Sequence, residues 1–276
     1  MSVARRAGVL GHPIAHSLSP TLHRAAYAGL ELDWEYEAYD VEESQLSGFI
    51  DGLGLEWAGL SLTMPLKVAA VPLMDFVEPM AKLVGAVNTV LIQHVGPMRQ
   101  LVGANTDVHG VVAALREQGV ARVESAVILG GGATATSAMA ALGQLGCTAP
   151  VVAVRSRARA GALVRAATRM GVAPRFVAFD DVARDLVHAD AVVSTIPADA
   201  AAALVPALTT ARGVLLDVVY EPLESPFAAS WTASGGTAVN GTRMLLHQAG
   251  EQVRLMTGRE APLDAMDAAL SQALTR

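Results

Sequence analysis

Three consecutive glycines, Gly130, Gly131 and Gly132, separate an apolar segment from a helical pattern, and no other feature of the sequence restricts the fold as much. Residues 125–129 predict a buried strand and residues 134–145 predict a helix. In a dinucleotide-binding turn of this order, Gly130 makes the tight bend and Gly132 lets the backbone approach a pyrophosphate. Ala133 and Thr134 then open the helix, whose free N–H groups favour phosphate. A glycine turn needed only for backbone reasons is the alternative.

The pattern around this turn predicts two α/β units. Further strands are expected at residues 151–154, 191–195 and 214–218, and helices at 108–118 and 158–170, which indicates a doubly wound, Rossmann-like parallel sheet. Before it, strands at 7–10, 36–41, 57–63 and 86–92 surround a helix capped by Ser19 and begun by Pro20. After it, helices at 242–257 and 263–274 either complete the second unit or pack on the first.

The composition excludes several classes of protein. The chain has 276 residues, of which 52% are hydrophobic and 17% charged, with a net charge of −6 and Cys147 as its one cysteine. Such a chain buries a core without a disulfide framework or a structural zinc cluster, and no metal site is predicted. Without a signal peptide or a long apolar segment, a cytoplasmic protein that contacts no membrane is expected. The acidic balance excludes general nucleic-acid binding.

The end of the second strand of the nucleotide unit is basic. Arg155, Ser156 and Arg159 stand there, together with Arg157, in a stretch from 125 to 179 that has no acidic residue. NAD enzymes usually carry an acid at this point to accept from the ribose 2′-OH, whereas an arginine fork suits a 2′-phosphate. We therefore predict NADP as the cofactor. The alternative is a solvated basic helix start.

Polar side chains gather where the predicted strands of the first unit end. The carboxyl ends of such strands form ligand sites, so these groups are expected to converge on one small polyol or carboxylate. Each also has a structural explanation as a helix cap or a turn residue. The residues are Ser17, Ser19, Thr63, Lys67, Asn88, Asn105, Thr106 and Asp107.

Lys67 and Asp107 are the predicted catalytic pair. Of the 20 basic residues only Lys67 and Lys82 are lysines, and Lys67 follows Pro65 at the expected site. Hydride arriving at a carbonyl carbon builds negative charge on the oxygen, which an ammonium group stabilises and Asp107 would keep charged. Whether Lys67 transfers the proton or acts electrostatically is left open.

Six ordered segments resemble the shikimate dehydrogenase family. They are residues 11–20 (GHPIAHSLSP), 61–67 (SLTMPLK), 85–89 (GAVNT), 103–110 (GANTDVHG), 217–222 (DVVYEP) and 241–248 (GTRMLLHQ). The resemblance runs over essentially the whole chain. It implies NADPH-dependent, reversible reduction of 3-dehydroshikimate to shikimate in aromatic amino acid biosynthesis, by a monomer or homodimer.

The resemblance also implies the domain limits and further site residues. Residues 1–106 and 242–276 would form a substrate-binding catalytic domain, with the last two helices returning to it, and residues 107–241 an NADP-binding domain. Tyr220 and Gln248 would join Ser17, Ser19, Thr63, Asn88 and Asp107 as substrate residues. Val218 and Gly241 would line the nicotinamide.

Three positions depart from the family pattern, and two other functions remain open. Ser61 replaces the usual Asn, Ala133 a second glycine of the phosphate turn, and Val154 the Asn before the cofactor arginine. The resemblance leaves open a quinate/shikimate or aminoshikimate dehydrogenase and a non-catalytic ligand sensor. Ser19 and Arg155 favour shikimate with NADP, and the presence of Lys67 and Asp107 favours an enzyme.

Overall fold

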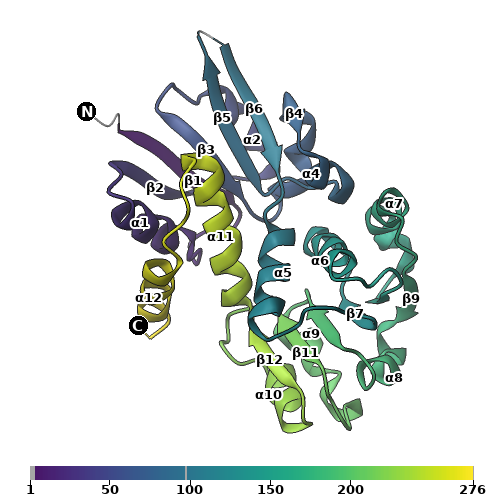
Figure 1. Ribbon diagram of the computed structural model, residues 1–276. Coiled ribbons are helices and arrows are strands. Elements are labelled where there is room, and N and C mark those ends of the chain that lie inside the picture. The colour runs from purple at the N-terminus through teal and green to yellow at the C-terminus, as the bar shows by residue number, and fades with distance from the viewer. Residues whose placement is uncertain (1–3, 97, 276) are drawn as a thin grey trace. The chain divides into compact units, whose positions relative to one another are not determined.

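The computed structural model describes residues 4–96 and 98–275, except for the side chains of Val95 and Arg159, and the chain forms two compact units (Figure 1). The first unit contains Met1–Thr106 and Leu246–Arg276, and the second contains Asp107–Leu245. Helix α11 (Gly241–Thr257) begins in the second unit and continues in the first. The expected limit at residue 241 falls at the start of this helix, and the structural division falls inside it.

The first unit is built on a six-stranded sheet with the order β2-β1-β3-β5-β6-β4. Its strands are β1 (Arg5–Gly11), β2 (Trp34–Asp40), β3 (Trp57–Leu62), β4 (Phe76–Val77), β5 (Thr89–Val95) and β6 (Met98–Ala104). All neighbouring pairs are parallel except those of β5, which runs antiparallel to both β3 and β6. The strand expected at 86–92 therefore begins later, and Asn88 precedes it instead of lying within it.

Helices cover this sheet on both faces. The helices are α1 (Ser19–Gly29), α2 (Leu46–Asp51), α3 (Leu66–Ala69), α4 (Pro79–Val84), the larger part of α11, and α12 (Leu263–Leu274). One core joins Leu10, Leu60 and Ile92 of the sheet to Leu46 and Leu66 of α2 and α3. Helices α1 and α12 lie side by side (Figure 1). Both C-terminal helices are thus packed as the resemblance implies.

The start of α1 differs from the expectation. Ser19 is the first helical residue, and Leu18 occupies the capping position without a side-chain hydrogen bond. The Ser19 backbone N–H instead donates to Oγ of Ser17, at 3.4 Å. Ser19 is therefore not the cap of α1, and its buried hydroxyl has no capping role.

The second unit is a parallel doubly wound sheet with the order β12-β11-β10-β7-β8-β9. Its strands are β7 (Ala126–Leu129), β8 (Val151–Val154), β9 (Arg175–Ala178), β10 (Ala191–Ser194), β11 (Val214–Asp217) and β12 (Thr237–Asn240). Its helices include α5 (Asp107–Glu117), α6 (Ala133–Gln144), α7 (Gly161–Met170), α8 (Ala183–Leu186), α9 (Ala198–Ala202) and α10 (Pro226–Ala233). The predicted Rossmann-like architecture is confirmed.

The chain order reverses between β7 and β10. Strands β8 and β9 follow β7 on one side, whereas β10, β11 and β12 extend the sheet on the other. Ligands of open α/β sheets bind beyond the carboxyl ends of the strands at such a switch point. The glycine turn after β7 therefore stands at the expected ligand crevice.

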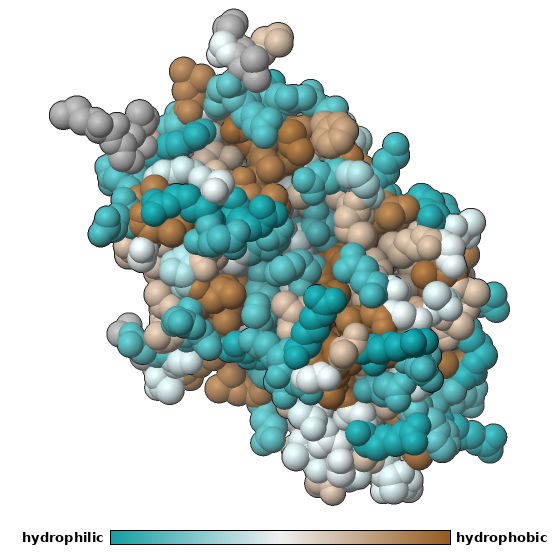
Figure 2. Space-filling view, viewed as in Figure 1, coloured by the Kyte–Doolittle hydropathy of each residue, from teal (hydrophilic) through white to brown (hydrophobic). Residues whose placement is uncertain are grey.

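Hydrophilic and hydrophobic residues are interspersed on the face shown in Figure 2. The large apolar side chains that are exposed come from separate segments and include Leu55, Met64, Phe76 and Met98. Among the residues that the structure describes, no helix combines the length and the apolar character needed to cross a membrane.

Candidate active site

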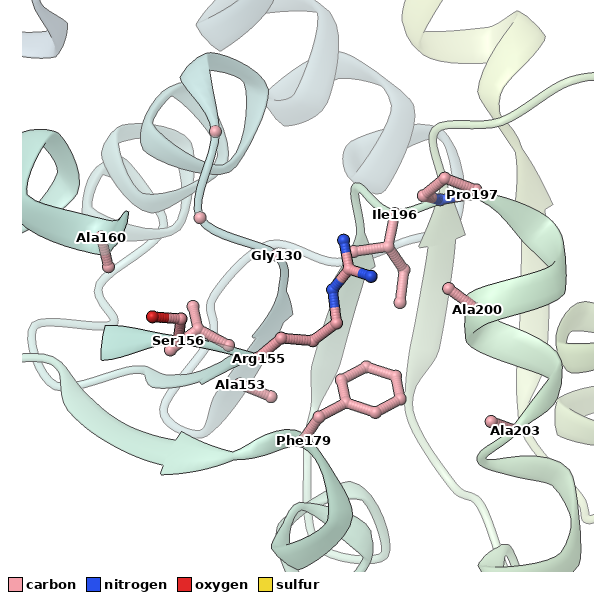
Figure 3. A pocket seen from close by; sticks show the side chains of 13 residues that line it. Gly130, Ala153, Arg155, Ser156, Ala160, Phe179, Ile196, Pro197, Ala200 and Ala203 are labelled. Carbon is pink, nitrogen blue, oxygen red and sulfur yellow. The ribbon is translucent and has the colours of Figure 1, made fainter. Parts of the chain in front are cut away.

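A cavity of about 520 Å³ opens beside the glycine turn of the second unit (Figure 3). Gly130, Gly131 and Gly132 form one wall, and Arg155 and Ser156 follow β8 on another. The remaining described lining is apolar and consists of Ala153, Val154, Ala160, Phe179, Ile196, Pro197, Ala200 and Ala203. An apolar cavity beside a glycine turn offers room for a nucleoside base next to a phosphate-binding backbone.

The first glycine is required by the geometry of the turn. Gly130 has a φ of +114°, and a Cβ there would lie 2.4 Å from Oγ1 of Thr195. Gly132 is the N-cap of α6 and has no side chain that would cover the first N–H groups of the helix. Ala133 is the first residue of α6 and has an ordinary negative φ. Among the described residues other than glycine, Glu31 alone has a positive φ. The departure at Ala133 therefore places no strain on the turn.

The three arginines after β8 are not equivalent. Figure 3 shows the Arg155 side chain reaching from the end of β8 into the cavity, toward Ile196. The Arg157 guanidinium instead lies over the ring of Phe176, 5.5 Å from its centre. Arg159 belongs to the 3₁₀ helix η3 (Arg157–Ala160), and its side chain lies outside the described residues. Among the described lining residues Arg155 alone is charged, which suits it to a phosphate.

Several lining residues were not predicted from the sequence. Phe179 comes from the segment after β9, and Ile196, Pro197 and Ala200 come from the segment after β10. The sheet order places both segments beside the turn after β7. The sequence could have indicated these residues through their position, because each segment directly follows a strand at the carboxyl edge of the sheet.

The predicted nicotinamide residues adjoin each other within the second unit. Gly241 approaches Val218 so closely that a Cβ on Gly241 would lie 2.2 Å from the Val218 carbonyl oxygen. The Val218 N–H donates to the Ser194 carbonyl at 2.9 Å, which attaches the end of β11 to β10. Tyr220 follows in the same loop, and burial raises the pKa of its phenol.

Four loops of the first unit meet at one edge of its sheet. The N–H groups of Thr63 and Leu62 donate to the carbonyls of Leu10 and Asn88, at 2.9 and 2.7 Å. The Asn88 N–H donates to the Ala104 carbonyl at 3.1 Å. Because β5 is reversed, its first residues lie at the edge where β1, β3 and β6 end.

Asn88 is the centre of the polar groups at this edge. Its Oδ1 accepts from the Thr106 N–H at 2.7 Å, and its Nδ2 donates to Oγ1 of Thr106 at 2.9 Å and Oε1 of Gln248 at 3.4 Å. The Asn105 amide donates to the Ala86 carbonyl at 3.0 Å. Four of the predicted polar residues are thus buried at this edge of the sheet: Asn88, Asn105, Thr106 and Gln248.

The other predicted substrate residues of the first unit follow strands β1 and β3. Ser17 and Ser19 follow β1, and Thr63 follows β3. His12, at the end of β1, is tied to β2 through a 2.6 Å contact of Nδ1 with Oδ1 of Asp40, and this hydrogen bond raises the pKa of the exposed imidazole.

The two predicted catalytic residues lie in helices of different units. Lys67 lies in α3, half-buried, and its carbonyl accepts from the Val87 N–H at 2.7 Å, which fixes its backbone beside Asn88. Asp107 is the first residue of α5 in the second unit and is 3% exposed. A carboxylate at a helix N-terminus is stabilised by the helix dipole. The pairing of Lys67 with Asp107 stays a prediction.

These features define a two-unit α/β protein, with a Rossmann-like nucleotide site in one unit and a site of hydroxyl and amide groups in the other. Two family models match, the shikimate dehydrogenase substrate binding domain at residues 9–90 and the shikimate 5′-dehydrogenase C-terminal domain at residues 241–270. Shikimate dehydrogenase (NADP(+)) of Moorella thermoacetica is 37% identical, with 96% of this chain and 92% of the relative covered.

Solved structures agree with this similarity. The shikimate dehydrogenase of Mycobacterium tuberculosis matches with a TM-score of 0.88 at 42% identity, over 97% of this chain and 99% of that chain. The quinate dehydrogenase of Corynebacterium glutamicum in complex with NAD matches with a TM-score of 0.87 at 30% identity, over 98% and 99%. The chain belongs to the shikimate dehydrogenase family.

Proposed function

We propose that this protein is an NADP-dependent shikimate dehydrogenase, which reversibly reduces 3-dehydroshikimate to shikimate. The polar edge of the first unit carries the proposal, since Asn88, Thr106 and Gln248 are buried there as a hydrogen-bonded set next to the Lys67 loop. A ring with one carboxylate and several hydroxyls matches such a set of donors and acceptors. The family membership supports the same activity.

The residues of the second unit fit NADP. The Gly130 turn, the uncapped start of α6 and Arg155 at the end of β8 suit a pyrophosphate and a 2′-phosphate. In addition to Gly130, Gly131, Gly132 and Arg155, we assign Ala133, Thr134, Ser156 and Arg159 to this cofactor, with Val218 and Gly241 on the nicotinamide side. When bound, NADPH supplies the hydride, and the cavity and the glycine turn hold its nucleotide end.

The predicted substrate and catalytic residues would hold the substrate and stabilise the charge that develops on it. Ser17, Ser19, Thr63, Asn88, Tyr220 and Gln248 are assigned to the hydroxyls and carboxylate, so that the ring carbonyl faces Lys67. As the carbonyl carbon gains the hydride, its oxygen becomes negative and is stabilised by the Lys67 ammonium. Asp107 is assigned to the substrate and to catalysis together with Lys67. The oxygen finally takes a proton, and shikimate leaves.

The nucleotide site separates this function from quinate oxidation with NAD. The fold does not discriminate, because relatives of both kinds match it closely. Arg155 favours a 2′-phosphate, whereas an acidic residue in its place would favour NAD. A cytoplasmic location and a monomeric or homodimeric state are further proposals from the sequence.

Steady-state kinetics on two substrates with two cofactors tests the proposal. We expect the highest kcat/KM for shikimate with NADP⁺. A higher value for quinate with NAD⁺ would assign the protein to the quinate branch of the family. Binding of shikimate and NADPH without turnover between pH 7 and 10 would indicate a ligand sensor.

A further inference from the structure

A buried chain of hydrogen bonds lies behind the polar edge of the first unit, and Gln252 is at its centre. Gln252 lies on α11, one turn after Gln248, and is 1% exposed. Its Oε1 accepts from Oγ of Ser61 at 2.8 Å and is 3.2 Å from Nε2 of His23. Its Nε2 donates to the Asn88 carbonyl at 3.2 Å and to Oγ1 of Thr89 at 3.1 Å. All four positions of this amide are therefore used.

The phenol of Tyr36 determines which groups donate and which accept in this chain of hydrogen bonds. Tyr36 donates its hydroxyl proton to Oγ of Ser61 at 2.6 Å, so Ser61 has its own proton left to donate to Gln252. A phenol and a serine hydroxyl each have a single proton to donate. Ser61, which departs from the family pattern, therefore accepts one hydrogen bond and donates the next, so its own proton points to Gln252.

A reversed amide of Gln252 would be costly. It would place Oε1 against the Asn88 carbonyl oxygen and would face Nε2 with the proton of Ser61. His23 is compatible with this orientation: in the tautomer with its proton on Nε2, it donates to Oε1 of Gln252, and its Nδ1 accepts from the Tyr27 hydroxyl at 3.3 Å. A buried donor or acceptor left without a partner costs roughly 1–3 kcal/mol. The amide therefore has one favoured orientation.

The direction continues from Gln252 into the substrate residues. Thr89 accepts from Gln252 and donates to Oδ1 of Asn88 at 2.9 Å, which adds a second donor to the oxygen that already accepts from the Thr106 N–H. This oxygen is therefore the acceptor of the amide, and the Asn88 amide nitrogen is the donor. That nitrogen faces Oε1 of Gln248 at 3.4 Å, and the hydroxyl of Thr106 is equally close to the same oxygen. Oε1 of Gln248 therefore accepts inside the protein, which defines the orientation of this amide.

We propose that Gln252 is a positioning residue that, through Thr89 and the Asn88 carbonyl, holds the Asn88 amide in the orientation in which its oxygen accepts from Thr106 and its nitrogen donates to Gln248. The proposal rests on the proposed function, which assigns these two amides to the substrate. The orientations of both amides are then set before the substrate binds.

Matched variants of Thr89 and Gln252 test the chain. Thr89→Val removes the hydroxyl and keeps the shape, Thr89→Ser restores the hydroxyl, and Gln252→Met replaces the amide with an unbranched apolar side chain. Thr257→Val is the control, because this hydroxyl lies on the same helix and its partners are backbone atoms of Val253 and Arg259. Thermal unfolding and steady-state kinetics with shikimate and NADP⁺ are measured for each variant.

We expect Thr89→Val and Gln252→Met to raise KM for shikimate about tenfold, as loss of one oriented hydrogen bond implies. KM for NADP⁺ should stay within about twofold, and Thr89→Ser should recover most of the shikimate affinity. The double variant Thr89→Val with Gln252→Met should be about as impaired as the worse single variant, because both interrupt one chain. Thr257→Val should change the unfolding temperature and leave KM for shikimate unchanged.

Other outcomes would overturn the proposal. They are an unchanged KM despite lower stability, equal effects of Thr89→Val and Thr89→Ser, or independent effects in the double variant. If Gln252→Met does not fold, the comparison of the two Thr89 variants decides. If the wild-type protein does not oxidise shikimate, the proposed function is wrong, and coupling between Thr89 and Gln252 in urea unfolding then decides on the chain; a coupling factor below about twofold would refute it.

Discussion

The preference for NADP over NAD should depend on Arg155. Arg155→Leu removes the one charged side chain among the described residues that line the nucleotide cavity, and it leaves the glycine turn and the apolar walls in place. Because the ribose of NAD has no phosphate at this position, the substitution should weaken the use of NADP⁺ and leave the use of NAD⁺ unchanged.

The size of the effect follows from the exposure of Arg155. Its side chain is exposed at the mouth of the cavity, so its interaction with a phosphate is screened by water. At about 4 Å, two unit charges interact by about 1 kcal/mol in water and about 4 kcal/mol at an effective dielectric constant of 20. A charge-assisted hydrogen bond contributes about 1.5–3 kcal/mol. A loss of 2–3 kcal/mol corresponds to roughly a 30- to 150-fold lower kcat/KM for NADP⁺.

The assay is shikimate oxidation with each cofactor, at low salt and at about 0.5 M salt. Arg157→Leu is the matched control, because that guanidinium packs over Phe176 and should change kcat/KM by no more than about fivefold, from the ~0.5–1 kcal/mol of an exposed cation–π contact. Higher salt should reduce the difference between wild type and Arg155→Leu. An unchanged NADP⁺-to-NAD⁺ ratio in Arg155→Leu, or an equal loss in Arg157→Leu, would refute this assignment of the 2′-phosphate.

Three further substitutions test the site and the fold. Lys67→Ala should lower kcat by roughly 10²–10⁴ and leave KM for shikimate nearly unchanged, whereas a raised KM at normal kcat would make Lys67 a binding residue. Gly130→Ala should destabilise the protein in urea by more than Gly171→Ala, since both have a positive φ but only the first would add a contact, at 2.4 Å from Thr195. Burial lowers the pKa of His23 to about 4 from 6.5, so the unfolded chain binds its proton first and stability should fall as the pH drops from about 6.5 to 4, by roughly 3 kcal/mol. A His23→Gln variant should lose this slope, and an equal slope in that variant would exclude His23 as its source.

The strands that the sequence predicts best are buried on both faces. Strands β7, β10 and β11 are buried throughout and apolar except for the last residues of β10 and β11, Ser194 and Asp217, as expected for the centre of a parallel sheet. Their predicted limits agree with the structure to within one residue. The edge strands β9 and β12 contain exposed and half-buried residues and have no such run, so the pattern does not reveal them. In the first unit β4 has two residues and owes its pairing to β6, which only the folded chain provides.

The site residues could be predicted where they are consecutive in the sequence, as in the glycine turn between β7 and α6. They could not be predicted where the contacts join distant segments. His23 and Gln252 are separated by 229 positions, and nothing in either segment alone indicates a buried hydrogen bond between them. The same holds for Phe179 and Ile196, which reach the cavity because of the order of the strands.

The reversed direction of β5 explains why residues from the middle of the first unit join the site at all. If β5 were parallel to β3, Asn88 would lie at the opposite edge of the sheet, about 20 Å from the ends of β1 and β3 for a strand of seven residues. The β5–β6 hairpin instead begins and ends at the polar edge, where Thr89 pairs with Ala104. A shift of one residue in this pairing would turn alternate side chains to the other face and would separate Asn88 from Thr106. The register of one hairpin therefore keeps Asn88 beside Thr106.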